Sequence, residues 1–253
     1  PDLVEALRSK DSTLIYECLI AMQKIRDKSA ADRITFLLRD PDDRVQIAAL
    51  ETTGILQNRG ALSDLRTALD RARNNKVRRA ALTAIAMMPD EQNRRIMTGY
   101  LQDRDEGIRG AAAEGFGRLR NPADLPVIEK AFNEEKKLSP RLSQAFALVL
   151  LGKTELTEFS PLQYLVNTLN SSARQGEARA FLIELARDAQ IRAALEYSLK
   201  RGTKVEKIQL AQILSISGDA KTLSALDSLS KDTDADVAQE ALRAVRALKA
   251  RLP

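Results

Sequence analysis

The feature that most constrains this chain is an internal repeat of just over thirty residues. The segment Asp40–Leu50 recurs at Asn75–Leu82, Asp105–Ala113 and Asp234–Leu242, each time as polar residues followed by a branched apolar anchor, and the first three copies also have paired alanines. Anchors lie at positions 14, 45, 77, 108, 142, 205 and 237, and the one double-length gap holds a degenerate copy near 174–185. A repeat of this length predicts a solenoid, because one unit cannot bury its apolar face without its neighbours.

A second apolar series runs out of phase with the first. Its members are Leu7, Leu38, Leu69, Tyr100, Phe132, Leu169, Leu199 and Leu229. Each belongs to a stripe with helical spacing, so each period predicts two amphipathic helices of about 11–15 residues. The Asp and Asn residues before the anchors are expected to be helix N-caps, since their side chains accept the free amides of the first turn. The predicted fold is an all-α, right-handed α-solenoid of about eight stacked two-helix repeats.

The repeat has a recognisable consensus. The pattern D-x-D-x-x-V-R-x-A-A-L, followed after about ten residues by A-L-x-x-L, resembles the HEAT repeat family and, more narrowly, the bacterial phycobilisome-lyase HEAT-like type. This resemblance implies that the preceding helices form a convex side. It implies that the concave side is lined by the helices that carry Val45, Val77, Ile108, Leu142, Val205 and Val237.

The chain is predicted to be one HEAT-like domain, 1–253, with regular repeats at 1–135 and 203–253. The step from Phe132 to Leu169 is longer than the others, which indicates about six inserted residues within 133–139 or 152–161. We therefore expect an irregular or kinked region at 133–202.

Composition excludes several kinds of chemistry. The chain has no histidine and one cysteine, so it lacks a Ser-His-Asp or Cys-His arrangement and a multi-cysteine zinc site. Cys18 occupies the place of Ala49 in its repeat and is expected to be buried. Leu151–Thr154 imitates the end of a P-loop, and Asp232–Asp236 imitates the start of a calcium loop. Both are interpreted as helix ends, so no catalytic, cofactor or metal residue is predicted and the chain is expected not to be an enzyme.

Positive charge is concentrated in one part of the chain. The net charge is +5, and the stretch 71–79 holds five basic residues and no acidic one. The candidates for contact with an anionic partner are Arg71, Arg73, Lys76, Arg78, Arg79 and Arg109. For Arg78 and Arg109 the HEAT resemblance implies an alternative role, bonding loop Asp residues of neighbouring repeats. The lack of Trp and the low aromatic content of 4% leave few platforms for stacking bases.

The favoured function is a non-catalytic scaffold that binds a protein or peptide on its concave face, with Glu51, Thr83 and Glu114 as candidate contacts. The first alternative is nucleic-acid binding through the basic 71–120 edge. The second is a bilin lyase-type subunit, which the resemblance implies without assigning any residue. No segment is long and apolar enough to span a membrane. The chain is expected to be soluble, and cytoplasmic by default. Because it begins at Pro1 within an apolar pattern, it is interpreted as excised from a longer protein, which leaves room for a lost targeting segment.

Overall fold

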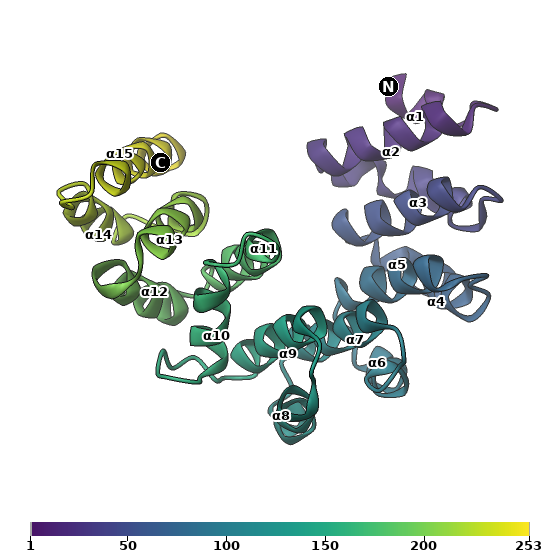
Figure 1. The fold of residues 1–253 in the computed structure, drawn as a ribbon. Helices are drawn as coiled ribbons and strands as arrows, with labels where there is room; N and C mark the ends of the chain where they lie inside the picture. Colours follow the sequence, from purple (N-terminus) through teal and green to yellow (C-terminus); the bar gives the residue numbers. More distant parts are fainter. Residues whose placement is uncertain (1, 253) are drawn as a thin grey trace. The chain divides into compact units, whose positions relative to one another are not determined.

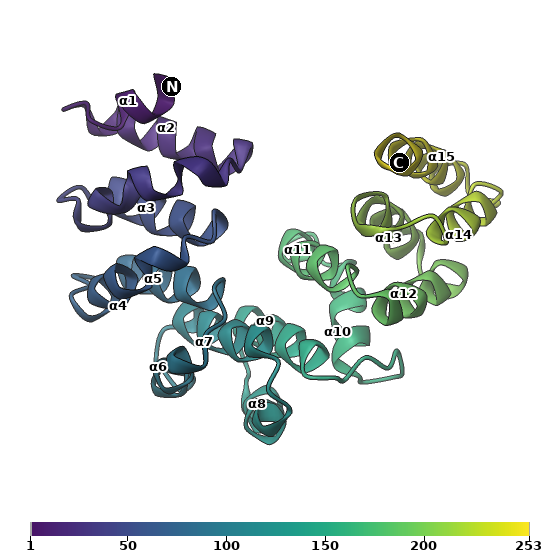
Figure 2. The same ribbon diagram turned by 180° about the vertical axis from the view of Figure 1, so that it is seen from behind.

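The computed structural model describes residues 2–252, and within that range it is helical and has no strand. It confirms the predicted all-α HEAT-type solenoid. The chain divides into two compact units, at 1–147 and 148–253. Each unit stacks its helices in two rows (Figures 1 and 2). We call the row that carries the repeat anchors the anchor row and the other the covering row.

In the first unit, successive anchor-row helices pack directly on one another, α2 on α3, α3 on α5 and α5 on α7. The anchor row consists of α2 (Ser12–Ile25), α3 (Asp43–Ile55), α5 (Asn75–Ala86), α7 (Glu106–Leu119) and α9 (Leu138–Leu150). The covering row consists of α1 (Asp2–Ala6), η1 (Lys28–Arg39), η2 (Arg59–Ala61) with α4 (Leu62–Asp70), η3 (Glu91–Asn93) with α6 (Arg94–Tyr100), and η4 (Pro122–Asp124) with α8 (Leu125–Glu134).

The second unit repeats this plan. Its anchor row is α11 (Gln175–Leu185), α13 (Lys204–Ser217) and α15 (Ala235–Arg251). Its covering row is α10 (Pro161–Thr168), α12 (Ala189–Arg201) and α14 (Thr222–Leu229). The degenerate copy expected near 174–185 is therefore a full anchor-row helix.

The predicted caps are present at the starts of the anchor-row helices. The Asp42 side chain accepts the Arg44 amide at 2.8 Å, and Asn74 accepts the amides of Lys76 and Val77. Asp105 and Asp234 act in the same way on α7 and α15. These bonds fix where each helix begins, which in turn fixes which residues face the core.

Two predicted anchors are not buried. Leu14 is 45% exposed, because the helix on its outer side, α1, is only five residues long. Val205 is 40% exposed because it is the second residue after its N-cap, whereas a buried anchor is the third. Thr203 is the N-cap of α13, and its third helical residue, the place of Val45, is Glu206, which closes a capping box with Thr203.

Apart from α12, the covering-row α-helices are shorter than predicted. The helices α4, α6 and α8 have 9, 7 and 10 residues, each after a single 3-10 turn, and Lys28–Arg39 is 3-10 helical throughout. The apolar spacing was a sound guide to which residues face the core. It does not distinguish an α-helix from a tighter helix over so few turns.

The irregular segment between α9 and α10 agrees with one of the two intervals expected to hold extra residues. Gly152, with φ +113°, follows the end of α9, and no helix follows until Ser160 caps α10. A left-handed residue after a helix is a C-cap, so the interpretation of Leu151–Thr154 as a helix end is confirmed. The interpretation of Asp232–Asp236 as a helix end is also confirmed. Asp234 is the N-cap of α15, and Asp232 accepts a hydrogen bond from Lys207.

One position of the anchor-row helices forms a buried seam within each unit. It is the seventh residue after each N-cap, and its side chain is buried in every repeat. The N-cap positions place Cys18, Ala49, Ala81, Ala112, Phe181, Leu210 and Ala241 at this seam. The burial predicted for Cys18 is confirmed, and burial raises the pKa of its thiol. A small seam residue brings neighbouring helices close together.

Candidate functional site

The basic residues of the stretch 71–79 do not form a single patch of unpaired cations. Arg73 pairs with Asp43 of the preceding repeat at 2.6 Å, and Arg79 pairs with Asp105 of the following repeat at 2.9 Å. Arg109 pairs with Glu135 of the following repeat. Arg71 and Lys76 have no ion pair within residues 2–252, and both are exposed. Half of the six candidate cations are therefore part of a ladder that ties one repeat to the next.

The ladder roles differ in part from those predicted. Arg109 bonds an acidic residue of the neighbouring repeat, as expected, although that residue is a Glu. Arg78 instead donates to Asn75 of its own helix at 2.7 Å, so its predicted ladder contact is wrong. Arg79 makes that contact, because Gly107 leaves the space through which its side chain passes. A Cβ at Gly107 would lie 2.0 Å from Arg79 Nε.

The three candidate protein contacts hold equivalent places. Glu51, Thr83 and Glu114 are each the ninth residue after the N-cap, on α3, α5 and α7. Surrounding protein atoms displace water from Glu51 and raise its pKa, although a hydrogen bond from Gln23 acts against this. Glu114 accepts hydrogen bonds from Arg118 at 3.0 Å and Ser143 at 3.1 Å. The side chains thus form a row across successive helices.

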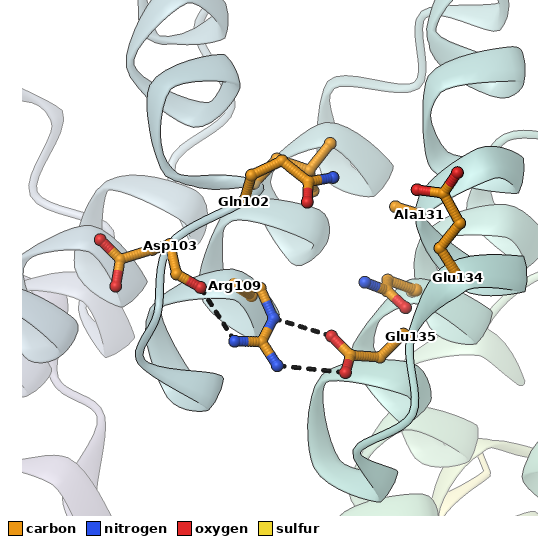
Figure 3. A pocket seen from close by; sticks show the side chains of 8 residues that line it. Gln102, Asp103, Arg109, Ala131, Glu134 and Glu135 are labelled. Atoms are coloured by element: carbon orange, nitrogen blue, oxygen red, sulfur yellow. Dashed lines mark hydrogen bonds and ion pairs between the residues drawn. The ribbon is translucent and has the colours of Figure 1, made fainter.

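A polar pocket of about 210 Å³ lies within the first unit. Its walls come from the end of α6, from α7, from the end of α8 and from α9. The residues that line it are Leu101, Gln102, Asp103, Arg109, Ala131, Glu134, Glu135 and Gln144. Figure 3 shows Gln102 and Glu134 on opposite sides, with the Arg109–Glu135 pair below them in this view.

The Arg109–Glu135 pair holds one end of the pocket together. Arg109 donates from Nε to Glu135 at 2.7 Å and from Nη2 at 3.1 Å, and its Nη1 donates to the backbone oxygens of Asp103 and Arg104. The two side chains are only 15% and 8% exposed. The hydrogen bonds to Glu135 raise the pKa of Arg109. Burial opposes the charge of Glu135, but the bonds from Arg109 and the Lys137 amide outweigh it and lower its pKa. Both groups are therefore ionised at neutral pH.

Gln144 is the unusual member of this pocket. It is only 1% exposed, and its Oε1 has no hydrogen-bond partner. The Arg141 amide donates to the Lys137 oxygen, just as the Gln46 amide donates to the oxygen of the N-cap Asp42. Lys137 therefore holds the N-cap position of α9. The seventh residue after it, the seam residue, is Gln144. In α3, α5 and α7 that residue is alanine. A buried polar atom without a partner costs about 1–3 kcal/mol, so packing alone does not explain this residue.

A second pocket, in the second unit, provides an internal comparison. It has a volume of about 220 Å³ and is lined by Glu196, Leu199, Lys200, Lys207, Ala225, Ser228, Leu229 and Asp232. It lies at the corresponding place in its repeats, with the Lys207–Asp232 pair at 2.8 Å in place of Arg109–Glu135. The seam residue there is Ala241. The polar seam residue is thus particular to the first pocket.

Sequence analysis identified Arg109 and missed the rest of the pocket. The signal was a glutamine where the repeat has alanine. Taking Leu142 as the anchor put Phe146 at the seam and concealed Gln144. The residue equivalent to Val45 is the buried Pro140, two positions earlier.

Within residues 2–252 no group of His, Cys, Asp and Glu side chains is arranged to hold a metal ion. No helix in that part of the chain is both long enough and apolar enough to cross a membrane.

Comparison with known proteins agrees with this architecture. A family model of HEAT repeats matches residues 1–86 and 64–149, which together make up more than half of the sequence. The chain belongs to the HEAT repeat family, whose repeats typically mediate protein binding. A comparison of the sequence with curated proteins found no match.

Among solved structures, the chain is similar to the complex of CpcE and CpcF of phycocyanin lyase from Nostoc sp. PCC7120. The TM-score is 0.65 at 19% identity, over 97% of this chain and 93% of that one. Human deoxyhypusine hydroxylase gives a TM-score of 0.44 at 17% identity, over 98% and 95% of the two chains. An archaeal HEAT-like repeats protein from Thermococcus onnurineus gives 0.31 at 16% identity, over 98% and 96%. At these identities the likeness shows the fold alone.

Proposed function

We propose that the protein is a non-catalytic scaffold that binds a protein partner along the exposed side of its first anchor row. The observation that carries this proposal is the use of the basic residues. Arg73, Arg79 and Arg109 are neutralised by carboxylates of neighbouring repeats. A nucleic-acid surface needs cations that remain available to phosphates.

The row formed by Glu51, Thr83 and Glu114 supports the same proposal. Its members hold equivalent positions on three consecutive helices, where Glu51 is exposed and Thr83 and Glu114 are partly buried. Such a row suits an extended segment of a protein partner, with one contact per repeat. The structural neighbour from Nostoc is itself a complex of two proteins, which is consistent with a protein partner.

Site-specific photo-cross-linking tests the proposal. A photoreactive amino acid is placed at Thr83 in the anchor row or, as a matched control, at the exposed Thr98 in the covering row. We expect discrete protein adducts from position 83 that are absent from position 98. Adducts that disappear after nuclease treatment, or equal labelling from both positions, would contradict the proposal.

Nucleic-acid binding remains the second candidate, because Arg71 and Lys76 are exposed and lack ion pairs. Fluorescence anisotropy with a random DNA duplex at about 50 and 200 mM salt tests it, since phosphate contacts weaken steeply over that range. The scaffold proposal expects no binding at either salt. A bilin lyase-type role would instead show as a shifted absorbance spectrum when the chain is mixed with a bilin.

A further inference from the structure

The pocket beside Arg109 contains more hydrogen-bonding capacity than the fold uses. The buried Oε1 of Gln144 lacks a donor, and the exposed carboxylate of Glu134 has no cation partner in the part of the chain that the structure describes. The side chain of Gln102 likewise forms no hydrogen bond within residues 2–252. Arg109 and Glu135 neutralise each other, so the pocket as a whole has an excess of negative charge and of acceptors.

We infer that this pocket receives an arginine side chain of the protein partner. A guanidinium group is planar and has five donors, so it can serve acceptors that stand on different sides of one pocket. Glu134 and Gln102 lie on opposite sides of the pocket (Figure 3), and Gln144 is a further lining residue. This inference rests on the proposed function and adds to it the chemistry of the partner.

The size of the pocket agrees with this ligand. Sites for drug-sized molecules and cofactors usually have volumes of roughly 300–1,000 Å³. The pocket, at about 210 Å³, is smaller and suits a single long side chain. Its lining is mainly polar, with Leu101 and Ala131 as the apolar residues along which the methylene stem can lie.

The corresponding pocket of the second unit indicates why the first one is specific. Its lining combines Glu196 and Asp232 with Lys200 and Lys207, so its charges balance. The alanine at its seam offers no acceptor. The two pockets therefore differ at the seam, which carries a small apolar residue beside the second pocket and a long polar one beside the first.

NMR titration of the whole chain tests the inference. The probe is N-acetyl-arginine amide, and its matched control is N-acetyl-citrulline amide, which has almost the same shape and no charge. The reporters are the Nε–H signal of Arg109 and the side-chain amide signals of Gln144 and Gln102. We expect saturable shifts with the arginine probe, at a dissociation constant on the order of 1 mM, and none with citrulline.

Two variants make the test specific. Gln144→Leu should abolish the shift of the Arg109 signal, and Glu134→Gln should weaken binding about two- to fivefold. Glu196→Gln, in the second pocket, should leave binding unchanged. Unchanged backbone spectra away from the pocket show that each variant folds.

Three results would overturn the inference: no shift with the arginine probe, equal shifts with citrulline, or full binding by the Gln144→Leu variant. None of these affects cross-linking from Thr83. Failure of the arginine pocket and failure of the scaffold proposal are therefore distinguishable.

Discussion

At the scale of single residues, Gln144 is where this chain departs from its own repeat. The seam residues of the three preceding anchor-row helices are alanines, and each is fully buried. Gln144 is also buried, but it brings a polar atom for which the fold provides no partner. A residue that costs stability without improving packing is a mark of a binding site.

Replacing this residue should therefore stabilise the protein. We expect Gln144→Leu to raise the free energy of unfolding by about 1–2 kcal/mol, because it replaces an unsatisfied amide with an apolar group of similar size. Urea denaturation measures the change. The adjacent Ser143→Ala serves as the comparison and should lower stability by about 0.5–1.5 kcal/mol, since Ser143 donates to Glu114. A loss of stability in Gln144→Leu would contradict this account.

At the scale of helices, the repeats are joined in two ways. The first is the close approach of anchor-row helices, where a Cβ at Gly54 of α3 would lie 2.8 Å from the Cα of Ala84 in α5. The second is the ladder of ion pairs between one repeat and the next. The two kinds of contact predict different costs when they are broken.

Gly54→Ala should destabilise the protein by about 1–3 kcal/mol, because the new methyl group meets backbone and forces α3 and α5 apart. Gly99→Ala is the matched control. Its Cβ would meet no atom within 4 Å, so the gain in helix propensity should stabilise α6 by about 0.5–1 kcal/mol. Thermal unfolding of both variants checks the opposite signs.

Arg109→Met should cost about 3–5 kcal/mol, because it leaves Glu135 buried without its partner. Arg39→Met removes a pair whose side chains are 63% and 42% exposed, so it should cost no more than about 1 kcal/mol. Adding Glu135→Leu to Arg109→Met should restore most of the stability. Denaturant titration of this double-mutant cycle measures the coupling, and equal costs at both arginines would refute the distinction.

Much of this helical organisation could be predicted from sequence, and the exceptions have identifiable causes. The caps at Asp42, Asn74, Asp105 and Asp234 were predicted because an N-cap is a local interaction. The exposure of Leu14 depends on what lies beside α2, and the position of Val205 depends on a capping box one residue away. The pocket needed side chains from four helices, and its seam glutamine was concealed by an alignment error of two residues.

At the scale of the whole molecule, stability is the sum of links between neighbouring repeats, and many of these links depend on ionised carboxylates. Hydrogen bonds from basic side chains and backbone amides lower the pKa values of Asp232 and Asp234. They also lower those of Asp105, Glu135 and Asp219, where burial acts in the opposite direction. A lowered pKa means that the stabilising contribution is complete above the unfolded-state value and is lost as the pH falls through the folded-state value.

We therefore expect the free energy of unfolding to be nearly constant from pH 7 to about pH 5 and to fall steeply below about pH 4. Glu51 has a raised pKa and works in the opposite direction, gaining stability as it is protonated. Urea denaturation at a series of pH values measures the profile. In Glu135→Gln the acid-induced fall should be smaller, and an unchanged slope would show that Glu135 does not contribute to it.

The seam of the anchor row also bears on how such proteins diversify. Because the seam residue of each repeat contacts only adjacent helices, exchanging one alanine for a longer polar residue creates a local receptor and leaves distant repeats intact. Each repeat of such an array can thus carry its own site for one residue of a partner, and duplication of a repeat adds one more site. In this chain Gln144 is a polar residue at the seam position where α3, α5 and α7 carry alanine.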